Sequence, residues 1–176
     1  MDTQLPESLR LILGRRSVRA FVPGEISDAQ VLQLLQAAMA APSAVARDPW
    51  RFVVIRRQPT MDALSQLLSN GEMLKSATLA IVVCGDIEAA HDRQLSYLLQ
   101  DCSAAIENLL LAAHGLGLGA CWLGVHPREE RILKVKALLS LPEAIVPVSC
   151  LAIGLPAETK PPRTRYQPAA VHYETW

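Results

Sequence analysis

Two clusters of alternating arginines are the residues of this chain best suited to binding chemistry. The first is the segment RRSVR at 15–19, which contains Arg15, Arg16, Ser17 and Arg19. In an extended segment, side chains at alternate positions point to the same side, so Arg15, Ser17 and Arg19 would face one ligand. Two guanidinium groups beside a hydroxyl suit a phosphate dianion, because the guanidinium fork pairs with the phosphate oxygens. A solvated basic turn is the alternative for these residues.

The second cluster, Arg163-Thr164-Arg165, lies in a proline-rich tail that follows Lys160. Taken by itself, this cluster is typical of a solvated tail. The net charge of the chain is +0, with 17 basic and 17 acidic residues, so two basic clusters stand out against a neutral background. The two clusters could converge on one phosphate, and whether they meet depends on the tertiary structure.

Glycines in the segment GLGLGACWLG at 115–124 form a third group. A dinucleotide-binding glycine loop follows a strand and opens a helix. This group follows a predicted helix and enters a predicted strand, so we reject a Rossmann-type loop. Glycine here is expected to end the helix and to let the backbone approach a flat ligand near Gly124.

Side chains for other kinds of catalysis are scarce. The sequence has no G-x-S-x-G elbow, no P-loop and no H-E-x-x-H motif, and its four histidines lack metal-ligand spacing. Asp86 ends a predicted strand, but a lone carboxylate is weak evidence for a site. The cysteines lack a C-x-x-C pair and are expected to be reduced and buried: Cys84, Cys102, Cys121 and Cys150. We therefore predict no metal site and no catalytic side chain, and expect a bound cofactor to supply the chemistry.

Composition predicts a single globular domain over residues 1–176, of which 51% are hydrophobic and 19% charged. The longest apolar runs fall far short of the ~20 residues that a membrane helix needs. The N-terminus lacks the basic-then-apolar order of a signal peptide. No basic run suited to a phosphate backbone occurs. These features predict a soluble, cytoplasmic protein with neither membrane nor nucleic acid as a partner.

Hydrophobic periodicity predicts an α+β fold, because helices and strands are mixed along the chain. Helices are expected over 5–13, 28–41, 60–69, 93–117 and from Pro127 to 139. Strands are expected over 50–55, 78–84, 120–125 and 145–153. Ser27 and Gln30 form a predicted capping box. Residues 155–176 have few periodic apolar positions and are predicted to form an extended arm.

The predicted helix over 93–117 is unusually long and apolar. Twenty-five residues at 1.5 Å each span about 37 Å, which exceeds the radius of a domain of this size. Small residues along it would let another backbone approach closely. We expect this helix to cross the core and continue into a subunit interface.

Taken together, the motifs resemble those of the nitroreductase family of flavin-dependent oxidoreductases. The resemblance covers nearly the whole chain in order: RRSVRAF at 15–21, APS at 41–43, PW at 49–50, QDCSAAIENLLLAAHGLGLGACWLG at 100–124, AIGLPAE at 152–158, PPRTR at 161–165 and VHYETW at 171–176. It implies an α+β fold with a central mixed sheet flanked by helices. It also implies an intertwined homodimer with two FMN molecules at the subunit interface.

The resemblance further implies which residues bind FMN. Those expected at the phosphate and ribityl chain are Arg15, Arg16, Ser17, Arg19, Arg163 and Arg165. Those expected beside the isoalloxazine, from the partner subunit, are Pro42, Ser43 and Ala44. Leu123 and Gly124 would offer backbone groups to the N5 and O4 edge of the flavin.

One segment departs from the family pattern P-S-x-x-N-x-Q-P-W. Here Ala46 and Asp48 stand where the family has amides. The family Asn helps to orient the flavin, so Ala46 removes a hydrogen bond worth ~0.5–1.5 kcal/mol. Such a loss weakens FMN binding at most about tenfold.

The expected activity is that of an FMN-dependent oxidoreductase. A hydride would pass from NADH or NADPH through flavin N5 to a small acceptor: a nitroaromatic, a quinone, an enone or another flavin. The alternative is a non-catalytic flavin- or nucleotide-binding member of the same fold, which Ala46 and Asp48 motivate.

Overall fold

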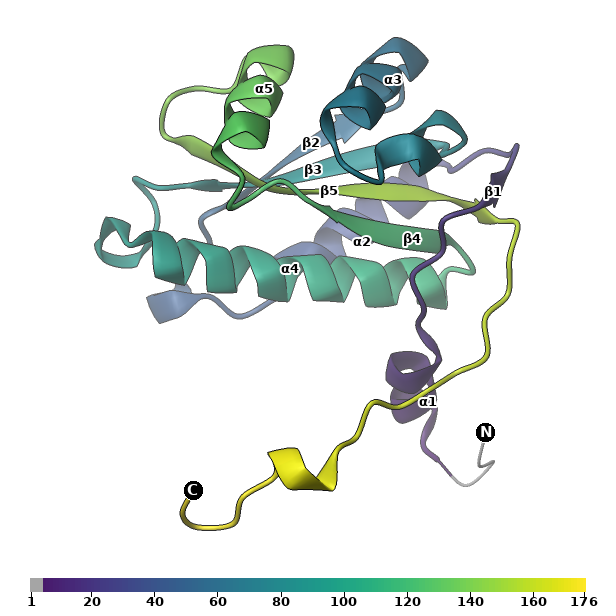
Figure 1. Ribbon diagram of the computed structural model, residues 1–176, viewed down its shortest axis with the longest axis vertical. Coiled ribbons are helices and arrows are strands. Elements are labelled where there is room, and N and C mark those ends of the chain that lie inside the picture. The colour runs from purple at the N-terminus through teal and green to yellow at the C-terminus, as the bar shows by residue number, and fades with distance from the viewer. Residues whose placement is uncertain (1–4) are drawn as a thin grey trace.

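A five-stranded sheet forms the centre of the protein, described here by a computed structural model over residues 5–176 (Figure 1). Its strands are β1 (Phe21–Val22), β2 (Trp50–Ile55), β3 (Leu79–Asp86), β4 (Gly119–Gly124) and β5 (Ile145–Pro156). The order is β1-β5-β3-β2, and β4 also pairs with β5. All pairings between these strands are antiparallel. The sheet was expected to be mixed. Within residues 5–176, the only parallel pairing is an isolated bridge between Ser17 and Ala120.

Helices cover both faces of the sheet, which gives the α+β arrangement predicted from periodicity (Figure 1). The helices are α1 (Glu7–Gly14), α2 (Asp28–Met39), α3 (Gln58–Leu67), α4 (Leu95–Gly115) and α5 (Glu129–Leu139). Helices α2 and α4 lie on one face, and α3 and α5 lie on the other. The predicted capping box is present at the start of α2, where Ser27 and Gln30 exchange hydrogen bonds.

Strand β3 explains why the core has two halves. Its side chains alternate between the faces, as in any strand. Leu79, Ile81 and Val83 pack in the cluster beneath α2 and α4, whereas Ala80 and Val82 pack in the cluster beneath α3 and α5. All five are fully buried. A strand that is apolar on both faces therefore organises both halves of the core.

The cysteines are free and buried, as predicted. Burial raises the pKa of Cys84, Cys102 and Cys150 to about 12. A thiol held protonated in this way is a poor nucleophile and a poor metal ligand. None of the helices in residues 5–176 has the length and apolar character needed to span a membrane.

Several predicted boundaries were wrong. Helix α4 is shorter at both ends than 93–117, because Asp92 and Arg93 adopt positive φ before it and Gly117 has φ +73° after it. Helix α5 begins at Glu129, not at Pro127. The strand predicted over 145–153 continues to Pro156, where it pairs with the unpredicted strand β1.

The segment after β5 is an extended arm. Residues 157–176 leave the sheet and run past α1, away from the body of the molecule (Figure 1). Its aromatic residues are exposed, with Tyr173 at 81% and Trp176 at 100% of full exposure. The first half of this arm nevertheless lies against the arginine segment, and that contact builds the candidate site.

Candidate functional site

The arginine segment is extended and is held on both sides by backbone hydrogen bonds. On one side, the N–H of Val18 donates to the carbonyl of Ala120 at the start of β4, over 3.0 Å. On the other side, the N–H of Ala157 donates to the carbonyl of Ala20 over 2.9 Å. The segment therefore lies between β4 and the C-terminal arm.

Polar side chains tie the arm to the same segment. The ammonium of Lys160 donates to the Ser17 carbonyl over 2.8 Å and pairs with Glu158 over 2.9 Å. The N–H of Arg19 donates to the Glu158 carboxylate over 2.7 Å, and the Arg16 guanidinium donates to the carbonyl of Pro161. The N–H of Arg19 and the ammonium of Lys160 lower the pKa of Glu158, which keeps this carboxylate charged. These contacts bring the second arginine cluster next to the first.

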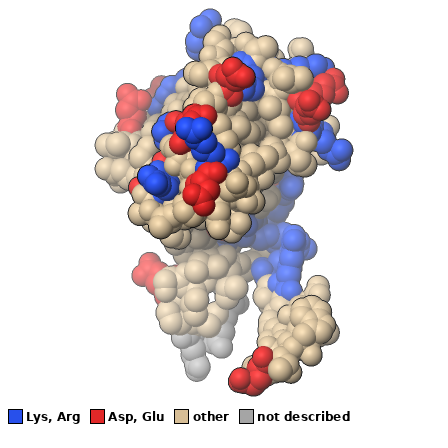
Figure 2. Space-filling view, turned by 90° about the vertical axis from the view of Figure 1, so that its left-hand side faces the viewer, with Lys and Arg blue, Asp and Glu red and all other residues tan. Residues whose placement is uncertain are grey.

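Both arginine clusters line one cavity of about 590 Å³, which we call the phosphate cavity. Its lining consists of Ile12, Leu13, Arg15, Arg16, Ser17, Arg19, Lys160, Arg163, Thr164 and Arg165. Six of these residues are cationic and none is acidic. Figure 2 shows Lys and Arg side chains gathered where the arm leaves the body.

Internal ion pairs neutralise only part of this positive charge. Arg15 pairs with Glu107 over 3.1 Å, and Lys160 pairs with Glu158. The guanidinium groups of Arg19, Arg163 and Arg165 form no ion pair with a carboxylate among residues 5–176. The cavity thus keeps an excess of positive charge, which favours a dianion such as a phosphate.

A second cavity of about 310 Å³, the ring cavity, adjoins the first because Arg19 lines both. Its lining consists of Arg19, Ser69, Asn70, Met73, Cys121, Trp122, Leu123, Gly124 and Arg131. The residues predicted to meet a flat ligand, Leu123 and Gly124, lie here at the end of β4. A Cβ added to Gly124 would meet nothing closer than the carbonyl oxygen of His126, at 3.8 Å. Neither the packing of the fold nor the backbone conformation therefore requires glycine at this position. The absence of a side chain leaves room for a ligand against the backbone.

The remaining predicted site residues lie elsewhere in this chain. Pro42, Ser43, Ala44 and Ala46 line neither cavity. They belong to a turn around the short 3-10 helix Ala44–Ala46, in which Val45 and Ala46 have positive φ. The N–H of Ala44 donates to the buried Asp101 of α4 over 2.9 Å. One chain by itself therefore does not bring this turn to the two cavities.

Asp48 closes that turn. Its carboxylate accepts a hydrogen bond of 2.5 Å from the Ser43 hydroxyl, and its N–H donates to the same hydroxyl over 2.9 Å. Asp48 also has positive φ. The residue that replaces a family amide thus bonds within its own turn.

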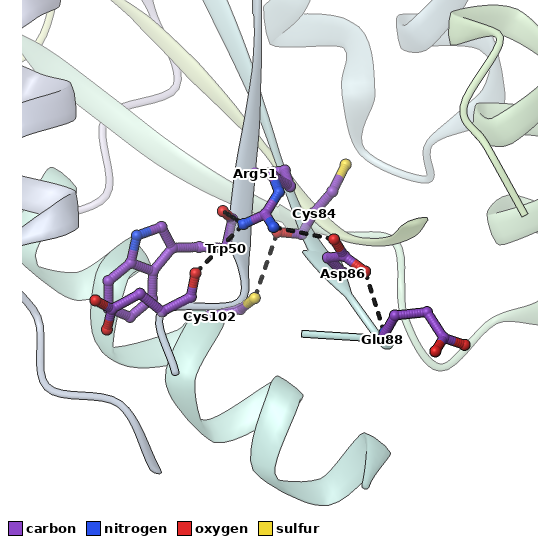
Figure 3. Close-up of polar contacts among 7 residues, drawn as sticks. Trp50, Arg51, Cys84, Asp86, Glu88 and Cys102 are labelled. Atoms are coloured by element: carbon purple, nitrogen blue, oxygen red, sulfur yellow. Dashed lines mark hydrogen bonds and ion pairs between the residues drawn. The ribbon is translucent and has the colours of Figure 1, made fainter. Parts of the chain in front are cut away.

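Asp86, the lone carboxylate considered above, holds two strands together. It pairs with Arg51 of β2 over 2.9 Å and accepts a hydrogen bond from the N–H of Glu88 (Figure 3). Arg51 also donates to the carbonyl of Trp50 over 2.8 Å. Asp86 lines neither cavity, and these contacts account for its position.

Several residues that line the two cavities were not predicted as site residues. Among them are Asn70, Arg131, Lys160 and Thr164. Lys160 and Thr164 stand next to the second arginine cluster, and that neighbourhood was a usable signal. Asn70 ends the segment after α3 with φ +62°, and Arg131 lies on a helix; neither has a local pattern that indicates a ligand.

Comparisons with known proteins agree with this architecture. The model of the nitroreductase family matches residues 12–71 and 59–155. A protein of Archaeoglobus fulgidus, provisionally named an NADH dehydrogenase/NAD(P)H nitroreductase, is 42% identical over 175 residues, which cover 98% of this chain and 100% of that protein.

Solved structures give the same result. A Parabacteroides distasonis protein with that provisional name has a TM-score of 0.92 and 36% identity, covering 98% of this chain and 100% of the other. A provisionally named nitroreductase from Desulfovibrio desulfuricans, solved in complex with FMN, has a TM-score of 0.84 and 32% identity, covering 98% and 99%. The chain belongs to the nitroreductase family.

Proposed function

We propose that this chain is an FMN-dependent oxidoreductase that uses NADH or NADPH to reduce a small electron acceptor. The observation that carries the proposal is the phosphate cavity, where two arginine clusters from opposite ends of the chain meet without an acidic residue in the lining. The relatives named for NAD(P)H and the FMN complex of a family member support the same assignment.

The residues present fit FMN. The phosphate cavity offers guanidinium forks and the Ser17 hydroxyl to a phosphate dianion. The ring cavity offers an open backbone at Gly124 to a flat ring. Arg19 lies between them, so a ligand with a phosphate at one end and a ring at the other can occupy both. Volumes of about 590 and 310 Å³ are typical of small-molecule and cofactor sites.

The chemistry that FMN supplies is hydride transfer, from nicotinamide to flavin N5 and from N5 to the acceptor. The lining of both cavities, within residues 5–176, contains no His, Asp or Glu. The side chains of this chain therefore bind and orient the ligand and set its electrostatic surroundings, and we assign none as acid or base.

A colour test decides between the reductase and a non-catalytic binding protein. Purified protein should be yellow, and the flavin absorbance should bleach when NADH or NADPH is added without oxygen. Yellow protein that neither nicotinamide reduces would favour the binding protein. Colourless protein that ignores added FMN would overturn both. Reoxidation of the bleached protein by a nitroaromatic, a quinone, an enone or free flavin would then identify the acceptor class.

We also propose that the protein works as a homodimer, so that the turn at 42–46 of one subunit completes the site of the other. Val45 in this turn is 70% exposed, and the aromatic arm is exposed as well. An intertwined interface of this kind buries more than ~2,000 Å². Sedimentation at micromolar concentration should give a species of twice the 19.2 kDa monomer mass. A predominant 19.2 kDa species would contradict the dimer.

Restoring the family amide at position 46 should stabilise the turn that contains Ala46. Ala46 has φ +52°, a conformation that Asn adopts more readily than Ala. We expect Ala46→Asn to raise the free energy of unfolding by up to about 1 kcal/mol, and to tighten FMN binding by up to about tenfold if the turn reaches the flavin.

Thermal unfolding of the FMN-free protein and titration of FMN fluorescence would measure the two effects separately. For the unfolding measurement, Ala44→Asn is the matched control, because Ala44 lies in the same turn without a positive φ. Unchanged FMN affinity in Ala46→Asn would separate this turn from the flavin.

A further inference from the structure

Arg131 joins three segments at the rim of the ring cavity. It lies in the first turn of α5, and its Nη1 donates to the carbonyl oxygen of Gly124 over 3.1 Å. Its Nη2 donates to the hydroxyl of Ser69, in the segment that follows α3. One guanidinium thus connects α5, the end of β4 and the segment that follows α3.

This contact fixes the peptide plane at the end of β4. The peptide between Gly124 and Val125 carries the Gly124 carbonyl at one end and the Val125 N–H at the other. Arg131 holds the carbonyl, and the N–H donates to the carbonyl of Val148 over 3.2 Å. The neighbouring Cα of Gly124 faces open space. The backbone edge that a flat ligand would meet is therefore held in one orientation.

Arg131 also contributes charge to the ring cavity. Arg19 and Arg131 are the charged residues of its lining, and both are cationic. The nearest acidic neighbour along the first turn, Glu130, pairs with Lys134 over 2.6 Å. The charge of Glu130 is thereby compensated by Lys134. Arg131 has no carboxylate partner among the described ion pairs.

We propose that Arg131 is a positioning residue with two effects on bound flavin. It aligns the backbone of Gly124 with the flavin edge, and its positive charge favours the reduced ring, which gains negative charge on reduction. The inference rests on the proposed function, since it concerns how the same site holds and tunes FMN.

Two substitutions separate the effects. Arg131→Lys keeps the charge but loses the two-pronged donor, so FMN should bind about tenfold more weakly while the ratio of reduced to oxidised flavin stays within about threefold of wild type. Arg131→Gln removes the charge as well. At a fixed potential of a reference dye, its ratio of reduced to oxidised flavin should fall about tenfold, which corresponds to ~30 mV for two electrons.

Lys136→Gln is the matched control, because Lys136 lies on the same helix but outside the ring cavity, and its ammonium donates to the carbonyl of Glu143 and not to a neighbour of Arg131. It should leave both FMN affinity and the ratio unchanged. Ser69→Ala releases the guanidinium from one of its two partners and should weaken FMN binding about two- to fivefold, which provides a test even if Arg131→Gln does not fold.

Chemical reduction with dithionite is used for the dye measurement, so the result does not depend on NAD(P)H. Wild-type protein that fails to bind FMN would overturn the proposed function. Wild-type protein that binds FMN, with the ratio unchanged in Arg131→Gln, would overturn the role of the charge. Unchanged FMN affinity in both Arg131→Lys and Ser69→Ala would overturn the role in alignment.

Discussion

Replacing Arg163 and Arg165 together with alanine is expected to weaken FMN binding by more than about a hundredfold. Both guanidiniums line the phosphate cavity, and each charge-assisted hydrogen bond contributes ~1.5–3 kcal/mol. Two such bonds contribute ~3–6 kcal/mol, and 1.4 kcal/mol corresponds to about tenfold in affinity. Since neither side chain pairs with a carboxylate in the described part of the chain, unfolding of the FMN-free protein should be unaffected.

Fluorescence quenching of FMN would measure this affinity, with riboflavin as the matched ligand. Riboflavin lacks the phosphate, so it should bind the wild type poorly and respond little to the double substitution. Arg57→Ala is the control for charge alone, because Arg57 lines neither cavity. Equal FMN affinity in the wild type and the double variant would show that the arm does not hold the phosphate.

Gly124→Ala is expected to weaken FMN binding by about fivefold to a hundredfold without lowering the melting temperature. The fold has room for the added methyl group, whose nearest neighbour would be the His126 carbonyl at 3.8 Å. A ring seated against Gly124 has no such room, and overpacking of a close contact costs roughly 1–3 kcal/mol. The methyl group therefore opposes the ligand and leaves the empty protein unchanged.

Gly85→Ala supplies the opposite pattern in the same protein. A Cβ at Gly85 of β3 would overlap the side chain of Leu98, which is fully buried in α4. Thermal unfolding should then show a clear loss of stability, whatever the ligand. If Gly124→Ala leaves FMN affinity at the wild-type level, the flavin does not lie against this end of β4.

Local patterns predicted most of the elements because their causes lie within a few residues. Strand β2 was predicted over its observed range, Trp50–Ile55, from its aromatic and β-branched residues. The capping box of Ser27 and Gln30 spans three positions and is present. Strand β1 escaped prediction because its two residues have no periodicity; it exists through pairing with Leu155 and Pro156.

The candidate site was likewise predicted only in part from the sequence. Alternation in the segment 15–19 and in Arg163-Thr164-Arg165 indicated two receptors for phosphate, since residue type and spacing carry that information. The open backbone at Gly124 was also indicated by a glycine near the end of a predicted strand. These patterns describe the binding of a phosphate and a ring, and the identities of the electron donor and acceptor do not follow from them.

The sequence by itself determined the kinds of element, the positions of the arginines and the membership of a family. Only the tertiary structure decided that Arg16 and Pro161, 145 positions apart, lie in contact and so merge two basic clusters into one cavity. It also decided that Arg131 reaches Gly124 and Ser69. The physical reason is that periodicity reports which face of an element is apolar, whereas a cavity depends on how separate elements pack. Contacts between distant segments follow from that packing and leave no local signature.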